Sequence, residues 1–262
     1  PPRSTLFPYT TLFRSQESRT VLFESKKVDL AIQTGKESYI HYANLNNIEL
    51  NLPESGYTAS LENLTLDYDQ SVSLSNLIFK KDSLSTKAIS ARVPAALLSG
   101  FDQSKIWRDK KFKADSLHLI QPKINLTLVI DSIADKEKKT IDINLKHLSI
   151  DKGTASFNVT DGMKKIQTKV GRMSAEFEGV DFQGINSGDM TPLYVSSFNA
   201  LFSDFKYVVQ GSDSLYVNGL SVSSSEGRFE IDTLSYVSSQ NHQNLLFPVI
   251  KASGFNLDRF WR

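Results

Sequence analysis

The side chains most able to do chemistry are scattered through this sequence. Its 4 histidines are His41, His118, His147 and His242, and none of them belongs to a metal-binding pattern such as H-E-x-x-H. His118 and His147 alternate with aliphatic residues, so we expect both on the exposed face of a strand. The histidines therefore predict neither a metal site nor an acid–base pair.

Carboxylates and nucleophiles give no stronger signal. Asp67 and Asp69 flank Tyr68, which predicts two carboxylates on the wet face of one strand, and strand alternation alone explains them. The chain has no cysteine, which excludes disulfides, thiolate metal sites and cysteine nucleophiles. It also has no P-loop, no G-x-G-x-x-G and no G-x-S-x-G motif. We expect a protein that is not an enzyme, with no catalytic residues, no metal and no cofactor.

Composition and charge indicate a globular chain without a nucleic-acid surface. Hydrophobic residues make up 40% and charged residues 23% of the 262 residues, and the formal net charge is +1. The nearest approach to a basic aromatic stripe is Lys110, Lys111 and Lys113 beside Trp107. Surface lysines over a crossover explain this group, so we expect no nucleic-acid partner.

The elements that position these residues are predicted to be strands. Aliphatic and polar residues alternate at 28–32, 48–52, 61–68, 72–75, 124–128, 141–145, 157–159, 215–217 and 229–231. This period of two is typical of strands with one dry face and one wet face. Turn signals at 53–56, 151–153, 161–162, 186–189, 211–213 and 225–227 separate the runs. The sequence predicts an all-β fold of antiparallel hairpins and meanders.

Two departures from this pattern bear on the domain organisation. Residues 94–112 have helical or irregular composition, which predicts one short helical crossover there. Val72–Leu77 resembles Leu215–Leu220, so we expect two related units, at about 20–131 and 140–262.

The first fifteen residues, PPRSTLFPYTTLFRS, resemble the in-frame translation of a sequencing adapter. We expect 1–15 to be a non-native segment and 16–262 to be the β-rich part of the chain. The alternative is a real strand, because Leu6, Phe7, Tyr9, Leu12 and Phe13 favour strands.

One long pattern resembles a known family. Residues 141–157 combine spaced aliphatic residues with Gly153 and Phe157, and 213–222 followed by 227–236 have the same style. This resembles the repeated unit of the AsmA-like and TamB-like bacterial envelope proteins, as found in Bacteroidota. The likeness covers most of 20–262 and rests on a diffuse pattern.

The resemblance implies a periplasmic protein, anchored in the inner membrane by an N-terminal helix that this chain does not show. It implies an elongated, twisted antiparallel sheet curled into a groove that binds or conducts phospholipid or another acyl-chain lipid between the inner and outer membranes, with other envelope proteins as further partners. The predicted lipid-groove residues are Ile124, Leu126, Leu128, Ile141, Ile143 and Leu145.

Two alternatives stay open at this point. The first is a closed β-sandwich that acts as a binding or adhesion module on the cell surface. The second is a carbohydrate-active β-protein, for which the sequence offers no acid–base pair. A sandwich buries its apolar faces against each other, whereas a lipid groove leaves a contiguous apolar strip open.

Overall fold

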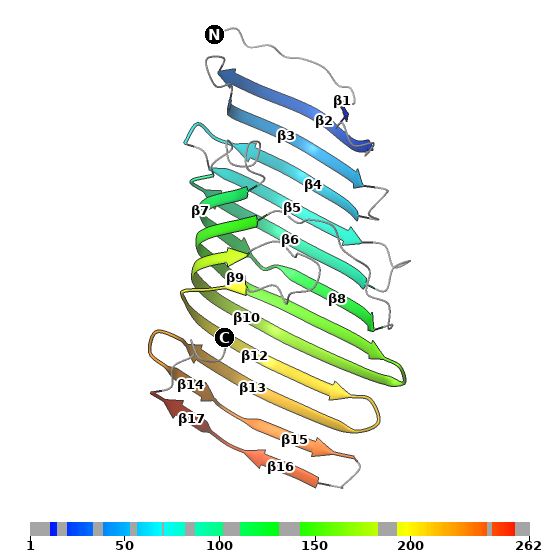
Figure 1. The fold of residues 1–262 in the computed structure, drawn as a ribbon, viewed down its shortest axis with the longest axis vertical. Coiled ribbons are helices and arrows are strands. Elements are labelled where there is room, and N and C mark those ends of the chain that lie inside the picture. Colours follow the sequence, from blue (N-terminus) through cyan, green and yellow to red (C-terminus); the bar gives the residue numbers. More distant parts are fainter. Residues whose placement is uncertain are drawn as a thin grey trace.

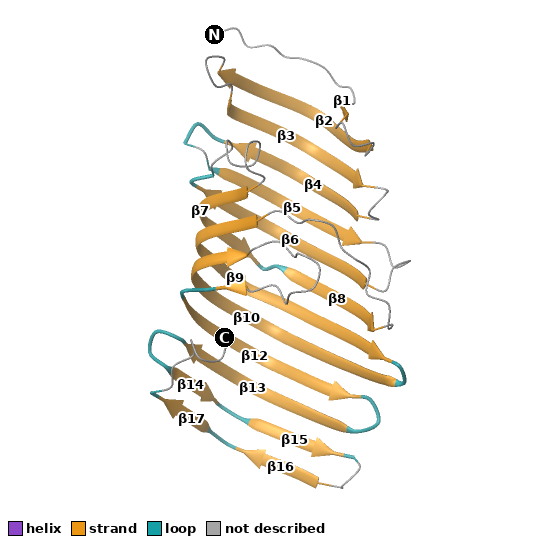
Figure 2. Cartoon of the chain, in the orientation of Figure 1, coloured by secondary structure: helices purple, strands orange, loops and turns teal. Residues whose placement is uncertain are grey.

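The strands of this chain stack along one direction as a single sheet. The computed structural model describes residues 11–14, 20–33, 39–52, 57–69, 71–81, 87–101, 111–130, 142–182, 193–239 and 243–254. Within these ranges the chain forms seventeen strands in one sheet and no helix (Figures 1 and 2). The predicted all-β class is therefore confirmed. The closed sandwich would need two sheets, and the described strands form one.

The first half of the sheet is a meander of neighbours. Each strand pairs antiparallel with the next, from β1 to β6. The strands are β1 (Thr11–Arg14), β2 (Thr20–Gln33), β3 (Tyr39–Leu52), β4 (Tyr57–Leu66), β5 (Val72–Lys81) and β6 (Lys87–Ser99). Thr11–Arg14 pairs with Thr20–Phe23, so strand-forming residues of the first fifteen do join the sheet.

One row of the sheet is built from two strands in line. β7 (Lys111–Ile120) and β8 (Lys123–Ile130) both pair antiparallel with β6 and both pair parallel with β9 (Asp142–Asp161). These two are the parallel pairings among the described strands. They lie at the boundary between the two units expected from the sequence, and they depart from the antiparallel meander that alternation predicts.

The second half returns to antiparallel order. β9 pairs with β10, β10 with β11 and β12, and β12 with β13. β13 then pairs with β14 and β15, which pair in turn with β17 and β16. The bounds are β10 (Lys164–Phe182), β11 (Leu193–Tyr194), β12 (Ser197–Val209), β13 (Asp213–Ser223), β14 (Arg228–Ile231), β15 (Leu234–Ser238), β16 (Gln243–Phe247) and β17 (Ile250–Ser253).

The parallel pairing requires the strands to curve. Ile130 lies beside Asp161, at the far end of β9 from Asp142. A straight strand of the length of β9 would span about 60 Å. Twelve peptide units connect Ile130 to Asp142, and a chain of that length reaches about 43 Å at most. The ends of β9 must therefore approach each other, and Figure 1 shows β9 and β10 curving strongly.

A line of irregular backbone crosses the sheet from β3 to the row of β16 and β17. We call this line the crease. Five of its residues have positive φ without being glycine: Asn47 (51°), Asn76 (48°), Gln121 (50°), Lys152 (52°) and Asp204 (54°). The register places them in one line with the remaining members, so that the crease comprises Asn47, Glu62, Asn76, Pro94, Gln121, Lys152, Gly171, Asp204, Gly219, Asp232 and Pro248. Aligned irregularities of this kind bend the strands they interrupt.

The crease also resets the alternation of side chains. On β5, Val72 and Leu74 share a face with Leu77 and Phe79, a step of three residues across Asn76. In a regular strand, residues three positions apart lie on opposite faces, so Leu77 and Phe79 would point away from Val72 and Leu74. The left-handed backbone of Asn76 compensates for the odd spacing, so the same face of the sheet is apolar on both sides of the crease.

A second, shorter crease crosses the strands from β6 to the junction of β11 and β12. It comprises Gly100, Asp115, Lys146, Gly179 and Ser196. Gly100 and Gly179 have φ near +60°. A Cβ on Gly100 would meet the Asp115 side chain, and one on Gly179 would meet Ser196. These close approaches explain why glycine occupies both positions.

The helical crossover predicted at 94–112 is wrong where the structure describes it. Residues 94–99 belong to β6 and residues 111–112 to β7, whereas 102–110 lie outside the described residues. Pro94 sits in a strand because it lies on the crease, opposite Asn76, where the ladder of hydrogen bonds is interrupted. Leu97 obscured the alternation because it is a large apolar residue on the polar face, 47% exposed.

Candidate functional site

One face of the sheet carries almost only apolar side chains. Cross-strand partners share a face, so the register groups these residues into four ladders that run across the strands. Two ladders lie on one side of the crease and two on the other. In all four, Lys81 is the one charged residue and Thr168 is the one hydroxyl residue besides tyrosine. We call this surface the apolar face.

The members of the ladders follow from the strand pairing. The rim ladder is Tyr57, Lys81, Ile89, Leu126, Phe157, Thr168, Tyr207, Leu215, Tyr236 and Leu245. The middle ladder is Leu50, Ala59, Phe79, Ala91, Ile124, Ala155, Val170, Phe205, Val217, Leu234 and Phe247. Across the crease, the inner ladder is Leu45, Leu64, Leu74, Ala96, Leu119, Ile150, Ala175, Ala200, Val222, Phe229 and Ala252. The far ladder is Ala43, Leu66, Val72, Leu98, Leu117, Leu148, Phe177 and Phe198.

Burial on the apolar face is deepest beside the creases. Ile48, Val93, Val170, Val217 and Ile231 each lie next to the crease and are buried. Away from it the same face is accessible. In the middle ladder Ala155, Val170 and Val217 are buried, whereas the other members are half-buried or exposed. This distribution is what a bent sheet produces, because side chains crowd along the bend and spread apart beyond it.

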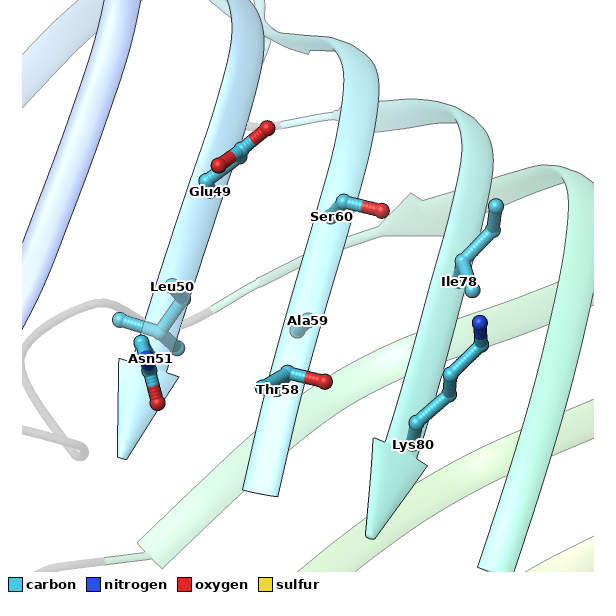
Figure 3. A pocket seen from close by; sticks show the side chains of 8 residues that line it. All are labelled: Glu49, Leu50, Asn51, Thr58, Ala59, Ser60, Ile78 and Lys80. Carbon is cyan, nitrogen blue, oxygen red and sulfur yellow. The ribbon is translucent and has the colours of Figure 1, made fainter. Parts of the chain in front are cut away.

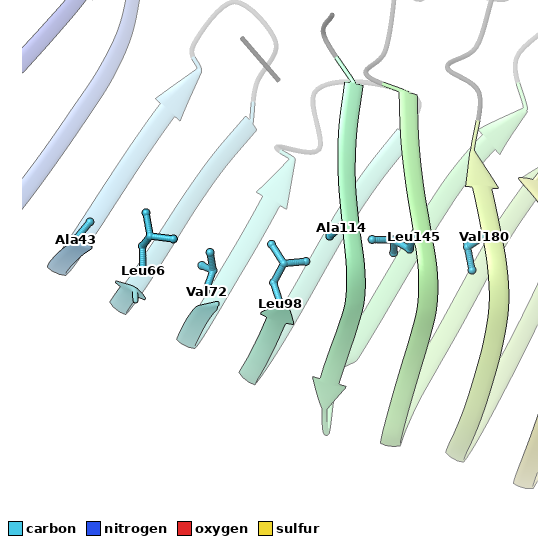
Figure 4. Packing of buried hydrophobic residues seen from close by; sticks show 7 residues of the cluster. All are labelled: Ala43, Leu66, Val72, Leu98, Ala114, Leu145 and Val180. Carbon is cyan, nitrogen blue, oxygen red and sulfur yellow. The ribbon is translucent and has the colours of Figure 1, made fainter. Parts of the chain in front are cut away.

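The best-packed part of the apolar face is the cluster in Figure 4, which comprises Ala43, Leu66, Val72, Leu98, Ala114, Leu145 and Val180. Four members belong to the far ladder, and the other three lie across the second crease. Phe101 and Phe112 pack against the cluster with their ring centroids 5.5 Å apart. The cluster is therefore a buried core at the far-ladder side of the apolar face.

The predicted lipid-groove residues fall into two groups on this face. Ile124 and Leu126 belong to the middle and rim ladders, and Leu128 lies one position further out, beside Val159. Ile143 and Leu145 lie at the other end of β9, beside Phe112 and Ala114. Ile141 lies outside the described residues. The sequence placed these residues on one face, but it did not show that about 40 Å of strand separates the two groups.

The opposite face is polar and linked by side-chain hydrogen bonds. Asn63 donates to the side-chain oxygens of Asn44 and Asn46, at 3.1 and 2.9 Å. Ser156 donates to Asn125 at 2.6 Å. Such bonds satisfy side chains that could not be buried without cost, and they identify this face as the wet one.

The histidines with described side chains lie on the polar face. His147 Nδ1 is 2.8 Å from Glu178 Oε1 on the neighbouring strand β10. His118 is partly exposed and lies beside Ser149. Their predicted position on the exposed face is confirmed. Both residues line a hollow of about 600 Å³ on the polar face, with Glu176 and Arg228 among the other lining residues.

A smaller hollow, of about 360 Å³, lies on the polar side of β3, β4 and β5 (Figure 3). Its polar side chains are those of Glu49, Asn51, Thr58, Ser60 and Lys80. It is shallow and open to solvent, and the figure shows no converging set of acid, base and nucleophile. The hollow therefore does not suggest a reaction.

The expectation that Asp67 and Asp69 lie on the wet face of a strand is wrong. β4 ends at Leu66, and the two carboxylates belong to the turn before β5. The backbone N–H of Asp67 donates to Ser71 O, and the N–H of Ser71 donates to Asp69 Oδ1 at 2.9 Å. Hydrogen bonds from the side chain and backbone of Ser71 lower the pKa of Asp69. The pair therefore stabilises a turn.

Comparison with known proteins does not assign the chain. No protein-family model matches it, and no curated protein matches it. In the part of the chain that the structure describes, no three His, Asp or Glu side chains gather closely enough to hold a metal ion. Nor do the described ranges contain a helix suited to crossing a membrane. The apolar face remains the feature with the clearest chemical consequence.

Proposed function

We propose that this chain is a non-catalytic segment of a bacterial envelope protein, and that its apolar face forms a trough that binds or conducts acyl-chain lipids between the inner and outer membranes. The observation that carries the proposal is the continuity of the four ladders across the sheet. The resemblance to AsmA-like and TamB-like proteins points the same way, and it favours a periplasmic location with an inner-membrane anchor and other envelope proteins as partners.

The size of the apolar face supports a ligand of lipid type. Ladders of eleven residues extend about 48 Å at the usual spacing between strands. The distance from the rim ladder to the far ladder, measured along β9, is about 30 Å. The outline of the face, about 1400 Å², is more than twice the largest apolar patch that a typical soluble monomer exposes, about 300–600 Å². Part of this outline is taken up by residues beside the creases that are buried. A surface this large is stable in water only when something apolar covers it.

The adhesion-module alternative has less support. A closed sandwich would cover the apolar face with a second sheet, and the described strands form one sheet. A carbohydrate site would favour the polar face, where the hollows are shallow and the described carboxylates are dispersed. An acyl chain needs no hydrogen-bond partner, and the apolar face offers almost none.

The test is lipid recovery from the purified protein. We expect the full chain, purified gently from a bacterial host, to carry phospholipid in near-stoichiometric amount by mass spectrometry. Leu126→Asp and Ile143→Asp place a charge on the two separated parts of the apolar face, so each should reduce the recovered lipid. Thr127→Asp is the matched control, because Thr127 is the exposed neighbour of Leu126 on the polar face.

Circular dichroism and urea unfolding must show that each variant is folded. A folded, lipid-free monomer of the parent chain would rule out the lipid-carrying role. Equal loss of lipid from the Thr127→Asp control would show that the effect does not depend on the face.

A further inference from the structure

The two margins of the apolar face differ in chemistry. The rim ladder contains Tyr57, Tyr207 and Tyr236, together with Thr168 and Lys81. The far ladder, at the other side of the face, contains no polar side chain. Residues with an apolar body and a polar tip accumulate where hydrocarbon meets water. At β4 and β5, where Tyr57 and Lys81 belong to the outermost described row, the rim ladder therefore has the composition of a hydrocarbon–water boundary. On β8 and β9, Leu128 and Val159 continue the apolar face one row further out.

Lys81 occupies a defined position on this boundary. Its Nζ lies 4.9 Å from the centre of the Tyr57 ring, and Tyr57 stacks on Phe79 with the ring centroids 5.2 Å apart. The ammonium is thus held over the Tyr57 ring on the apolar face, and Tyr57 in turn packs on Phe79. No carboxylate among the described residues forms an ion pair with it. A cation in such a place is suited to an anionic group at the end of an apolar ligand.

The strand that carries Lys81 is long enough for an acyl chain. From Phe79 to Val72, β5 presents apolar side chains over about 23 Å. One leaflet of a bilayer has an acyl layer of about 15 Å, half the thickness of its hydrocarbon core. A lipid whose charged end lies at Lys81 can therefore lay one acyl chain along β5 as far as the crease at Asn76.

We propose that Lys81, held against Tyr57, binds the anionic group of an acyl lipid and thereby orients the lipid with its head at the rim ladder. This inference rests on the proposed function, because it requires the acyl chain to lie on the apolar face. The anionic group is a carboxylate or a phosphate, and both accept hydrogen bonds from an ammonium.

The test compares ligands that share a sixteen-carbon chain and differ in the head. Equilibrium dialysis of the delipidated full chain measures the binding of palmitate, palmitoyl lysophosphatidate and hexadecanol. Lys81→Gln should weaken binding of at least one of the two anionic ligands by about three- to tenfold and leave hexadecanol unchanged. Lys81→Arg should retain the affinity. Lys80→Gln is the control, because Lys80 is the exposed neighbour on the polar face.

The outcomes separate the two proposals. If hexadecanol and the anionic ligands bind the parent chain and Lys81→Gln equally well, Lys81 does not hold the head, and the lipid-binding face stands. If no ligand binds the parent chain, the proposed function itself fails. If Lys81→Gln weakens the binding of palmitate alone, Lys81 binds a carboxylate head. If it weakens the binding of lysophosphatidate alone, Lys81 binds a phosphate head.

Discussion

Gly171 of β10 lies opposite Asp204 of β12 so closely that a Cβ on Gly171 would be 2.6 Å from the Asp204 Cβ. Both residues belong to the crease, and Asp204 has a φ of 54°. The two neighbouring strands therefore meet at the bend through one position without a side chain and one left-handed position. This arrangement makes the crease testable by substitution.

The first prediction concerns this pair. Gly171→Ala should lower the free energy of unfolding by about 1–3 kcal/mol, because the new methyl group overlaps the Asp204 side chain. Adding Asp204→Gly should recover most of the loss, since it removes the overlap and suits the left-handed backbone. Urea unfolding of the two single variants and the double variant measures the coupling. Purely additive effects would contradict the contact.

The second prediction concerns the left-handed positions. Gln121 is exposed, with a φ of 50°, at the junction of β7 and β8. Gln121→Gly should be at least as stable as the parent chain, because glycine adopts this conformation without steric cost. Gln121→Val should be less stable than Gln121→Gly by about 1–2 kcal/mol, because a β-branched side chain disfavours positive φ. Thermal unfolding gives the order, and equal stability of the two variants would refute the backbone argument.

The third prediction concerns acid pH and the end of the sheet. Glu230 Oε1 accepts from Lys251 Nζ at 2.6 Å, and Oε2 accepts from Arg228 Nη2 at 2.7 Å. These two hydrogen bonds lower the pKa of Glu230 below its usual 4.5. The stabilisation is therefore present above pH 4.5 and is lost as the pH falls through the lower, folded-state pKa.

Amide hydrogen exchange in β14 and β17 should consequently accelerate at acid pH in the parent chain, after correction for the intrinsic exchange rate. Glu230→Gln should remove most of this pH dependence. Glu226→Gln is the control, since Glu226 is exposed and its oxygen lies 3.9 Å from Arg228. A parent chain whose β14 protection does not change with pH would show that the ion pairs do not stabilise this edge.

The fourth prediction distinguishes an open face from a closed core. Leu145 is 3% exposed, whereas Phe157 is 37% exposed on the same face. Leu145→Ala should cost about 2–5 kcal/mol. Phe157→Ala should cost about 1 kcal/mol, although phenylalanine is the larger residue, because much of its ring is already in contact with water. In a closed core Phe157→Ala would cost more than Leu145→Ala. Urea unfolding of the two lipid-free variants therefore decides between an open face and a closed core.

The alternation of apolar and polar residues in the sequence predicts the strands and the apolar face. It does not predict the creases. The signal at 151–153 predicts a turn, yet Lys152 lies inside the long strand β9. The strand bends at Lys152, which has a left-handed backbone, between Asp151 and Gly153. The same residue types are common in turns between strands. The signals at 161–162, 211–213 and 225–227 do mark turns between strands. One sequence does not distinguish the two uses, because the difference depends on pairing with strands far along the chain.

The similarity between 72–77 and 215–220 has a related explanation. It aligns Asn76 with Gly219, and both residues lie on the crease. β5 runs from the far ladder toward the rim, whereas β13 runs away from the rim. The two segments thus share the three-residue step across the crease, and whether the two units are related stays a prediction. Lys81 was not a candidate from the sequence, because its place on the apolar face depends on how Asn76 shifts the alternation of β5.

Because of the crease, the width and the length of the sheet depend on different features of the chain. Strand length and the bend within each strand set the width, and the number of hairpins sets the length. From β3 to β6 each strand supplies one crease residue, so adding or removing one antiparallel hairpin in this part of the sheet should leave the remaining ladders in register. A longer or shorter chain would then change the length of the apolar face and leave its width unchanged.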